Sequence, residues 1–493
     1  MRLVVLDKVS DKLFKMRRIA YASPVNPAPS GISDYSEELL PYLGQYADIT
    51  LYVDDGLRPS NTQMTAVLKQ RPISALPRDH ARHNYDAILY HLGNSPVHNG
   101  IWTALQLQPG VVVLHELVLH HFMLGYAANL LRKPEVYLGE VARRYGAEGE
   151  RVARLMLRGR LTEAAFTMPL SERVLEAAEG LIAHSRYVLE RAAALRPDLP
   201  AAHVPMGVPL PPQIPRTQAR QRLGLPEDAL ILASFGHINP YKRLDAVLRA
   251  LRTLRDQHPR LRYLLVGSIS PNYDVRAAVA RAGLEDIVSI TGYVERAAFE
   301  DYVAAADICL NLRHPTAGET SASLLRLLGA GRPTLVTASG SFAELPPDVA
   351  AQVDLDASEG ELILAYCHLL ATQPNIAAAL GANARAFVAR DHTLQGAAAA
   401  YIRFLAERYG WGDAPIMRPP LWRVAEAQEP GGEARGLGLE AGGREFHTLA
   451  LSGELKTQNS TLKTLGEALA GLGATEDDTP LLRSAARTLA DLS

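Results

Sequence analysis

Short apolar runs, separated by polar turns and longer amphipathic segments, recur along most of this chain. Each run is three to six residues long and rich in Val, Ile and Leu, which is typical of strands buried on both faces of a sheet. These runs are residues 18–22, 48–53, 86–91, 111–114 and 180–183, then 230–235, 263–266, 288–290, 334–337 and 351–353. Helical segments such as residues 36–45 and 244–257 lie between them. Strands that alternate with helices predict an α/β fold with parallel sheets.

The runs fall into two halves. We expect a leader at residues 1–16, a first domain at 17–208 that contains a helical insertion at about 122–180, and a second domain at 228–408. The Pro-rich stretch 209–227 is predicted to link the two domains. From residue 409 the composition changes, and Pro and Gly interrupt any element up to the end of the chain, so 409–493 is predicted to be a flexible tail with short helices near 462–472 and 480–492.

Composition limits the possible partners. The chain has 493 residues, 47% of them hydrophobic and 21% charged, and its net charge of −2 gives no reason to expect a nucleic-acid partner. Cys309 and Cys367 lie in apolar contexts and are predicted to be core residues. No apolar run is long enough to span a bilayer and no signal-peptide core follows the start, so a cytoplasmic protein is expected. Peripheral contact with a membrane is left open.

A turn with unusual chemistry follows the apolar run that ends at Leu312. Pro315 and Gly318 break the chain, and Thr320 or Ser321 can cap the leucine-rich helix that comes next. A strand, a glycine turn and a helix N-terminus together make an anion site. Glu319 lies in this turn, and Arg326 follows two helical turns later. The alternative is an N-terminal acid favoured by the helix dipole, and a solvated Arg.

Similar turns follow other strands of the second half. After residues 230–235 come Gly236 and His237, then Lys242 and Arg243, at the entrance to the next helix. The glycine leaves backbone N–H groups unpaired, and Lys242 supplies a point charge for a phosphate. The alternative is that Lys242 is a solvated residue at a helix start. Two further strands end at glycine turns, at Gly267 and at Gly292 with Tyr293.

In the first half, ligand-binding residues are expected at the carboxyl ends of the strands. A Pro-rich loop after residue 22 leads to Gly31, Asp34 and Tyr35, and the strand 86–91 is followed by a turn that contains Gly93. His115 follows the strand 111–114.

The segment that begins at His115 and Glu116 is superficially similar to a zinc-binding motif. Its next histidines, His120 and His121, follow at i+5 and i+6, whereas a metalloprotease helix needs i+4, so this interpretation is excluded. His120 and His121 are predicted to be structural.

Several short segments around Glu319 carry a family resemblance. Asp307-Ile308, Gly331-Arg332-Pro333 and the segment 342–346 resemble the donor-site signature of retaining glycosyltransferases of family 4, over about residues 17–408. This resemblance implies the GT-B fold, in which two doubly wound Rossmann-like domains face each other across a cleft. The family usually has two glutamates with seven residues between them, one for the donor sugar and one for the nucleotide ribose. Their columns fall here at Gly318 and Arg326, so Glu319 is expected to take the first role and no carboxylate takes the second.

The resemblance also implies roles for the other residues. His115, Glu319 and Lys242 would act on the transferred sugar and the departing diphosphate. The nucleotide would be held by a larger set: Gly236, His237, Lys242, Arg243, Gly267, Gly292, Tyr293, Gly318, Glu319, Thr320, Ser321 and Arg326. Gly31, Asp34, Tyr35 and Gly93 would face the acceptor and the phosphates.

The expected activity is retaining transfer of a hexosyl-type sugar from a nucleotide-diphosphate sugar to a glycan, lipid or small-molecule acceptor. No cofactor and no metal are expected. A pair of acids at Asp354 and Asp356 lies past the last predicted strand, and no third carboxylate completes an oxygen cage there. Two alternatives remain. One is an epimerase or hydrolase of the nucleotide sugar, and the other is a non-catalytic subunit that binds it.

Overall fold

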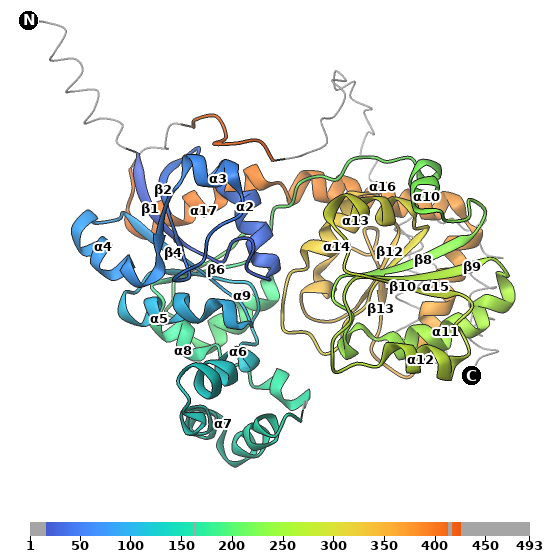
Figure 1. The fold of residues 1–493 in the computed structure, drawn as a ribbon, viewed down its shortest axis with the longest axis horizontal. Helices are drawn as coiled ribbons and strands as arrows, with labels where there is room; N and C mark the ends of the chain where they lie inside the picture. Colours follow the sequence, from blue (N-terminus) through green and yellow to red (C-terminus); the bar gives the residue numbers. More distant parts are fainter. Residues whose placement is uncertain (1–15, 161–162, 413–416, 425–493) are drawn as a thin grey trace, which may run out of the picture. The chain divides into compact units, whose positions relative to one another are not determined.

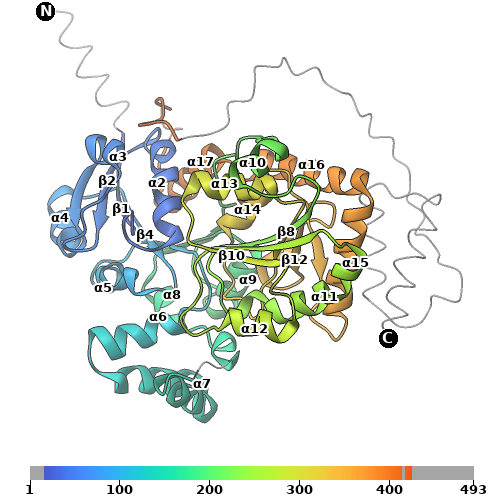
Figure 2. The same ribbon diagram turned by 45° about the vertical axis from the view of Figure 1, so that its right-hand side comes forward.

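The computed structural model describes residues 16–160, 163–412 and 417–424 (Figures 1 and 2). The chain forms two compact units. Of the described residues, the first unit comprises those up to Pro209, the short segment Pro315–Ala322 and those from Arg390 onward. The second comprises Leu210–His314 and Ser323–Ala389. The leader up to residue 15 and the two helices expected near 462–472 and 480–492 lie outside the described residues.

The first unit is built on a parallel sheet of seven strands in the order β3-β2-β1-β4-β5-β6-β7. Its register is set by pairs such as Ile19 with Ile49 in β2 and with Ala87 in β4. Central strands such as β5 are buried along their whole length, which explains their unbroken apolar sequence. The strands are β1 (Arg17–Ala22), β2 (Ala47–Val53), β3 (Lys69–Pro72), β4 (Ala87–Leu92), β5 (Val111–Leu114), β6 (Gly180–Ala183) and β7 (Ala201–His203).

Helices connect these strands and cover both faces of the sheet. They are α2 (Gly31–Leu43), α3 (Thr62–Val67), α4 (Leu76–His83), α5 (Asn99–Leu107), α9 (Arg186–Leu195) and the final helix α17 (Leu394–Tyr409), which packs against α2. Helix α2 begins five residues before the expected start at residue 36, because the Ser30 hydroxyl caps it by accepting a hydrogen bond from Ile32 N. Gly31, Asp34 and Tyr35 are therefore helical residues, not loop residues.

Between β5 and β6 the chain forms a helical layer, which contains α6 (His120–Gly125), a π-helical turn η3 (Tyr126–Leu130), α7 (Pro134–Leu157) and α8 (Glu172–Ala177). The Tyr137 hydroxyl lies 2.5 Å from His120 Nε2, and His120 Nδ1 lies 2.8 Å from the Met168 carbonyl oxygen. Arg144 also forms an ion pair with Glu176. These contacts make His120 a structural residue that fixes α7 to the rest of the unit.

The second unit contains six parallel strands in the order β10-β9-β8-β11-β12-β13. The strands are β8 (Leu230–Phe235), β9 (Leu261–Val266), β10 (Val288–Gly292), β11 (Ile308–Asn311), β12 (Thr334–Thr337) and β13 (Ala351–Val353). The helices are α10 (Arg216–Leu223), α11 (Leu244–Gln257), α12 (Val275–Ala282), α13 (Arg296–Ala305), α14 (Ala322–Gly329), α15 (Glu359–Thr372) and α16 (Pro374–Asp391). Cys309 and Cys367 are buried free thiols of this core.

The strand order has the same form in both sheets. In the first sheet successive strands are added on one side of β1 up to β3, and from β4 onward they are added on its other side. The second sheet changes side in the same way between β8 and β11. The loops after β1 and β4, and those after β8 and β11, therefore diverge to opposite faces of their sheets. Ligands of open α/β sheets bind at such switch points, outside the carboxyl ends of the strands. The prediction of two doubly wound α/β domains is confirmed.

The unit boundaries differ from those expected. The predicted linker 209–227 contains helix α10, whose Arg220 is buried and donates to the carbonyl oxygens of Ala305 and Ala229 and to the carboxylate of Asp307. Helix α17, whose residues fall almost wholly within the predicted bounds 228–408, belongs to the first unit, as expected of a last helix that crosses back onto the first domain. Of the described residues, no single helix is long and apolar enough to cross a membrane. One pair, Glu359–Thr372 and Pro374–Tyr409, passes that test only jointly, across a bend of 103°.

Part of the predicted tail packs on the first unit. Arg418 N donates to the Gln45 carbonyl oxygen at 2.9 Å, and Leu421 N donates to that of Pro41 at 3.2 Å. Trp422 is buried. The Leu421 side chain occupies the space that a Cβ on Gly44 would need. Residues 417–424 therefore form an ordered strap across the end of α2.

This packing predicts that Gly44→Ala destabilises the protein. Gly44 has φ −65°, so a helical alanine is unstrained there and the main obstacle is the clash with Leu421. We expect the free energy of unfolding to fall by roughly 1–2 kcal/mol, measured by urea denaturation. In a Leu421→Ala background the same change should cost nothing, and an equal loss in both backgrounds would contradict the strap.

Candidate functional site

Three glycines line the carboxyl ends of β8, β9 and β10. Gly236, Gly267 and Gly292 all have positive φ, at 87°, 148° and 75°. A Cβ on Gly267 would collide with the carbonyl oxygen of Gly236, so the two loops approach at a distance that only glycine allows. Gly267 also forms a bridge with Gly292. We call these three neighbouring turns, at the edge of the second sheet, the glycine floor.

Lys242 lies beside this floor. It ends a short 3-10 turn in which Asn239 Oδ1 accepts a hydrogen bond from Tyr241 N at 3.1 Å. The Lys242 side chain is buried, and its Nζ donates to the Phe235 carbonyl oxygen at 2.6 Å. A Cβ on Gly236 would lie 3.7 Å from the same Nζ. The ammonium group is thus fixed against the glycine turn at the end of β8, where it can hold an anion.

Three other predicted site residues near Lys242, namely Arg243, His237 and Tyr293, have different surroundings. Arg243 forms an ion pair with Glu359 of α15, with Nε 2.8 Å from Oε1. This pair directs the guanidinium toward α15. His237 Nδ1 lies 2.9 Å from Ser268 Oγ, which joins the loops after β8 and β9. Tyr293 follows Gly292 and is 74% exposed, so its ring is an open surface at this edge.

The loop after β11 begins in the second unit. His314 N donates to the Tyr241 carbonyl oxygen at 2.9 Å, and Arg313 N donates to Thr337 Oγ1 at 2.8 Å. These bonds tie the loop to the Lys242 turn on one side and to β12 on the other. The start of the Glu319 segment is therefore fixed next to the switch point between β8 and β11.

The continuation, Pro315–Ala322, belongs to the first unit. The Ala317 carbonyl oxygen accepts hydrogen bonds from Leu117 N at 2.8 Å and Val118 N at 3.0 Å. Gly318 has φ 83°, and a Cβ there would lie 3.1 Å from Leu117 and from Tyr187. This close approach holds the turn directly beside the loop that carries His115.

Glu319 orders its own turn. Its Oε2 accepts hydrogen bonds from Thr316 Oγ1 and from Ala317 N, both at 2.9 Å. Thr316 Oγ1 in turn accepts one from Gly318 N at 3.0 Å. Thr320 and Ser321 follow, and α14 begins at Ala322. The carboxylate is thereby held in a defined position next to the His115 loop.

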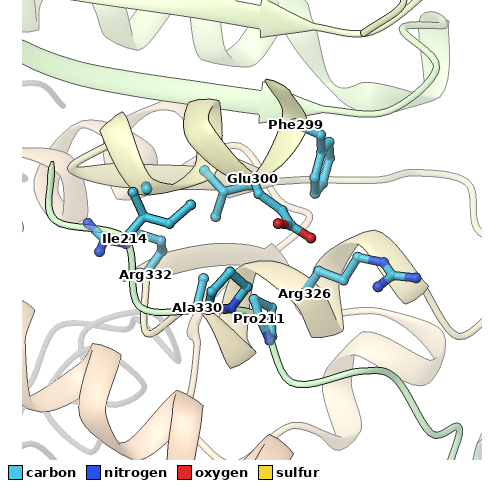
Figure 3. Close-up of a pocket in the computed structure, with 10 residues that line it drawn as sticks. Pro211, Ile214, Phe299, Glu300, Arg326, Ala330 and Arg332 are labelled. Carbon is cyan, nitrogen blue, oxygen red and sulfur yellow. The ribbon is translucent and has the colours of Figure 1, made fainter. Parts of the chain in front are cut away.

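Arg326 lines a separate hollow of the second unit (Figure 3). The hollow is small, with a cavity volume of about 20 Å³, and it lies between α13, α14 and the segment that begins at Pro211. Phe299 and Glu300 of α13 face it, and Glu300 also pairs with Arg296 at 3.2 Å. The structure thus places Arg326 opposite α13, in a groove between two helices.

His115 belongs to a buried group of rings at the carboxyl edge of the first sheet. Its Nε2 lies 3.0 Å from Nδ1 of His91, the fifth residue of β4. Its ring packs 5.0 Å from that of His184, which follows β6, and 5.4 Å from Tyr35 of α2. Tyr35 also places its hydroxyl 3.2 Å from that of Tyr401 in α17. Tyr35 is therefore a buried packing residue of this cluster and does not face an open loop.

Hydrogen bonds to backbone carbonyl oxygens fix the tautomers of His184 and of a further buried histidine, His98, which precedes α5. His98 Nδ1 must donate to the His91 carbonyl oxygen, at 3.1 Å, and His184 Nδ1 must donate to that of Val204, at 2.8 Å. Burial lowers the pKa of His98 to about 4 and that of His184 to about 4, because desolvation penalises the charged imidazolium. Burial, followed by repulsion from His184, lowers the pKa of His115 well below its usual range. His115 is thus a neutral imidazole at pH 7.

The remaining predicted residues of the first unit surround this cluster. Gly93 follows β4, and a Cβ there would lie 2.6 Å from Ile32 and 3.3 Å from Glu116 Oε1, so it is required by close packing. Glu116 Oε1 accepts a hydrogen bond from Asn94 N at 3.2 Å. Gly31 has no atoms near its Cβ position and leaves the start of α2 open.

Asp34 lies on the exposed side of α2, and it accepts a hydrogen bond from Asn26 Nδ2 at 2.9 Å. It therefore stabilises the loop between β1 and α2 from outside the ring cluster.

Sequence reasoning missed the histidines that surround His115. His91, His98 and His184 were not predicted to be site residues, although His91 and His184 lie at strand ends just as His115 does. That shared position was the available signal. The described residues contain no group of three or more His, Cys, Asp or Glu side chains that could hold a metal ion.

Comparison with known proteins identifies the fold. Residues 215–386, which carry the glycine floor, Lys242 and Arg326, match the family model "Glycosyl transferases group 1". Sucrose-phosphate synthase from Thermosynechococcus elongatus superposes with a TM-score of 0.58 at 18% identity, over 80% of this chain and all of that one. Anabaena HepE in complex with UDP and glucose superposes with a TM-score of 0.55 at 15% identity, over 80% of this chain and all of that one. The chain therefore has the fold of the GT-B glycosyltransferases.

Among curated proteins, D-inositol 3-phosphate glycosyltransferase from Streptomyces scabiei is 30% identical over 223 residues, which are 43% of this chain and 45% of that protein. The same-named protein from Streptomyces coelicolor is 32% identical over 137 residues, 26% of this chain and 29% of that protein. The chain thus spans less than half the length of these relatives.

The buried histidines predict a loss of stability in mild acid. Their folded pKa values near 4 lie below the unfolded value of about 6.5, so the unfolded chain binds more protons as the pH falls. The cost begins near pH 6.5 and grows until pH 4, by up to roughly 3 kcal/mol for each histidine. Denaturant unfolding between pH 7.5 and pH 4.5 measures this slope.

The matched variants are His98→Asn and His83→Asn. Asparagine can keep the hydrogen bond to the His91 carbonyl oxygen without titrating, so the slope should become shallower. His83 is exposed, so its replacement is the control for loss of a surface histidine. Equal slopes in the wild type and His98→Asn would contradict the assignment.

Proposed function

We propose that this protein is a glycosyltransferase that moves a hexosyl-type sugar from a nucleoside-diphosphate sugar to an acceptor hydroxyl, with retention of anomeric configuration and without a metal ion. The observation that carries the proposal is the buried Lys242 ammonium fixed against the glycine floor of the second unit. It lies inside the segment that matches the group 1 glycosyl transferases.

The chemistry of the floor fits a diphosphate. Gly236 and Gly267 bring the loops at the ends of adjacent strands close together, and the Lys242 ammonium lies beside Gly236. Preorganised donors of this kind stabilise the charge that develops on a departing diphosphate, and they need no reorganisation during the reaction. The similar HepE structure is a complex with UDP and glucose, which agrees with a nucleotide-sugar donor.

We assign the transferred sugar to the pair of loops that carry His115 and Glu319. Two hydrogen bonds to the Ala317 carbonyl oxygen keep these loops together. A carboxylate and a neutral imidazole are suitable partners for sugar hydroxyls. With a pKa well below 7, His115 would hydrogen-bond as a neutral ring and would not carry a proton at neutral pH.

Transfer itself tests the proposal against its rivals. The protein is incubated with UDP-, GDP-, ADP- and TDP-glucose, with and without D-inositol 3-phosphate, the acceptor that the curated relatives' names indicate. We expect release of nucleoside diphosphate that depends on the acceptor, unchanged after EDTA treatment, and a product with the donor's anomeric configuration by NMR. Release without acceptor indicates a hydrolase, and a changed sugar without transfer indicates an epimerase. Activity lost with EDTA and restored by magnesium would contradict the role given to Lys242.

Lys242→Ala should weaken binding of both the donor and the free nucleoside diphosphate. The lost charge-assisted contact is worth roughly 1.5–3 kcal/mol, about a 10- to 150-fold rise in Kd. Titration calorimetry with the nucleoside diphosphate measures it. Lys69→Ala is the matched control, because Lys69 is an exposed lysine of β3 in the other unit. Unchanged affinity in Lys242→Ala would remove this lysine from the site.

A further inference from the structure

The start of helix α7 exposes an unusual cluster of apolar side chains. Eight large hydrophobic side chains of the described residues are exposed, and three of them, Leu130, Leu131 and Val136, lie within seven residues. The others are scattered along the chain as single residues, which is ordinary for a protein surface. All eight consecutive residues from 129 to 136 are exposed. We call this run the α7 tip.

The α7 tip is an ordered structure. Leu131 N donates to the Tyr126 carbonyl oxygen at 3.0 Å and Lys133 N donates to that of Ala127 at 2.8 Å, which closes the π-helical turn. Arg132 then takes a left-handed conformation with φ 54°, and Pro134 starts α7. The next residue to be buried is Tyr137, which is tied to His120. The leucines are therefore held outward by a fixed backbone.

Position and charge add a second observation. In both ribbon views the α6–α7 layer lies on the outer side of the first unit, beyond α5 and α8 from the sheet (Figures 1 and 2). Residues 130–160 contain eight Arg or Lys and four Glu, a net charge of +4 in a chain whose net charge is −2. The four glutamates include Glu140, Glu148 and Glu150, which form ion pairs within α7.

Four cations of this segment have no carboxylate partner among the described residues. They are Arg132 and Lys133 at the tip, and Arg158 and Arg160 at the end of α7. Cations beside exposed aliphatic side chains are the combination that binds an anionic bilayer surface: the leucines enter the boundary between headgroups and acyl chains, and the long basic side chains reach the phosphates.

We propose that the α7 tip docks the protein on anionic membranes through Leu130, Leu131 and Val136, with Arg132 and Lys133 at the lipid headgroups. A protein partner fits the observations less well. The tip offers three aliphatic side chains and none of the exposed Tyr or Trp that anchor protein interfaces. This proposal does not depend on the catalytic role of either unit.

Vesicle binding tests it with the full chain. Sedimentation with vesicles of phosphatidylcholine that contain about 30 mol % phosphatidylglycerol should pull down the wild type, and pure phosphatidylcholine should retain much less. Replacing Leu130 and Leu131 together by Asp should lower the partition coefficient at least about tenfold. Leu107→Asp is the matched control: Leu107 is 70% exposed at the end of α5 in the same unit, and its replacement should change nothing.

Charge is tested separately. Arg132→Asn keeps the left-handed conformation accessible, and with Lys133→Gln it should weaken binding to the anionic vesicles by about fivefold per charge. Each variant is compared with the wild type for its unfolding midpoint, so that misfolding is recognised. The proposal is overturned if the wild type ignores anionic vesicles, or if the double Asp variant binds as the wild type does. It is also overturned if that variant instead turns a dimer into a monomer in analytical ultracentrifugation, since the tip would then bind a second copy.

Discussion

The hydrogen-bonding order of the two parallel sheets is the constraint on which the rest of this protein depends. Because all strands run the same way, every loop that follows a strand emerges at the same edge. Because the order reverses at β1/β4 and at β8/β11, neighbouring loops diverge there and leave backbone groups without sheet partners. The glycine floor, Lys242, the His115 loop and the start of the Glu319 segment all lie at these edges. The central strand β5 is wholly apolar and supplies none of these groups.

Close backbone approach is the second requirement, and glycine meets it. Gly267 lies so close to the Gly236 carbonyl oxygen that a side chain has no room, and a Cβ on Gly318 would lie in tight contact with Leu117 and Tyr187. Both glycines have positive φ, so any L-residue would also add strain. These contacts bring loops from separate strands into fixed register, which is what a site built on several loops needs.

Buried polar side chains at the carboxyl edge of the first sheet lower the stability of the first unit. A cluster of neutral imidazoles and tyrosine hydroxyls is buried where aliphatic side chains would pack without desolvation cost. Nε2 of His91, His98 and His184 is buried without a hydrogen-bond partner among the described residues. A structural core has no need of such groups. Their concentration around His115 supports a functional edge in this unit, in the same way that the buried Lys242 does in the other.

The sequence by itself determined the parts that depend on neighbours along the chain. Apolar runs located the strands at 111–114, 180–183, 230–235 and 334–337 to the residue, and glycine turns marked the carboxyl ends of β8, β9 and β10. The sequence pattern placed the start of α2 too late, because it did not reveal that the Ser30 side chain caps the helix. It also missed helix α10, whose buried Arg220 satisfies carbonyl groups that are distant in sequence.

Only the tertiary structure decided which side chains meet. It placed Arg326 in the groove beside Phe299 and Glu300, turned Arg243 toward Glu359, and packed His115 against imidazoles from two neighbouring strand ends. It also assigned the Glu319 turn to the first unit, although both chain neighbours of that turn belong to the second. Periodicity and turn chemistry act over a few residues, whereas partners such as Arg243 and Glu359 lie 116 residues apart and are brought together by strand order, which no local pattern encodes.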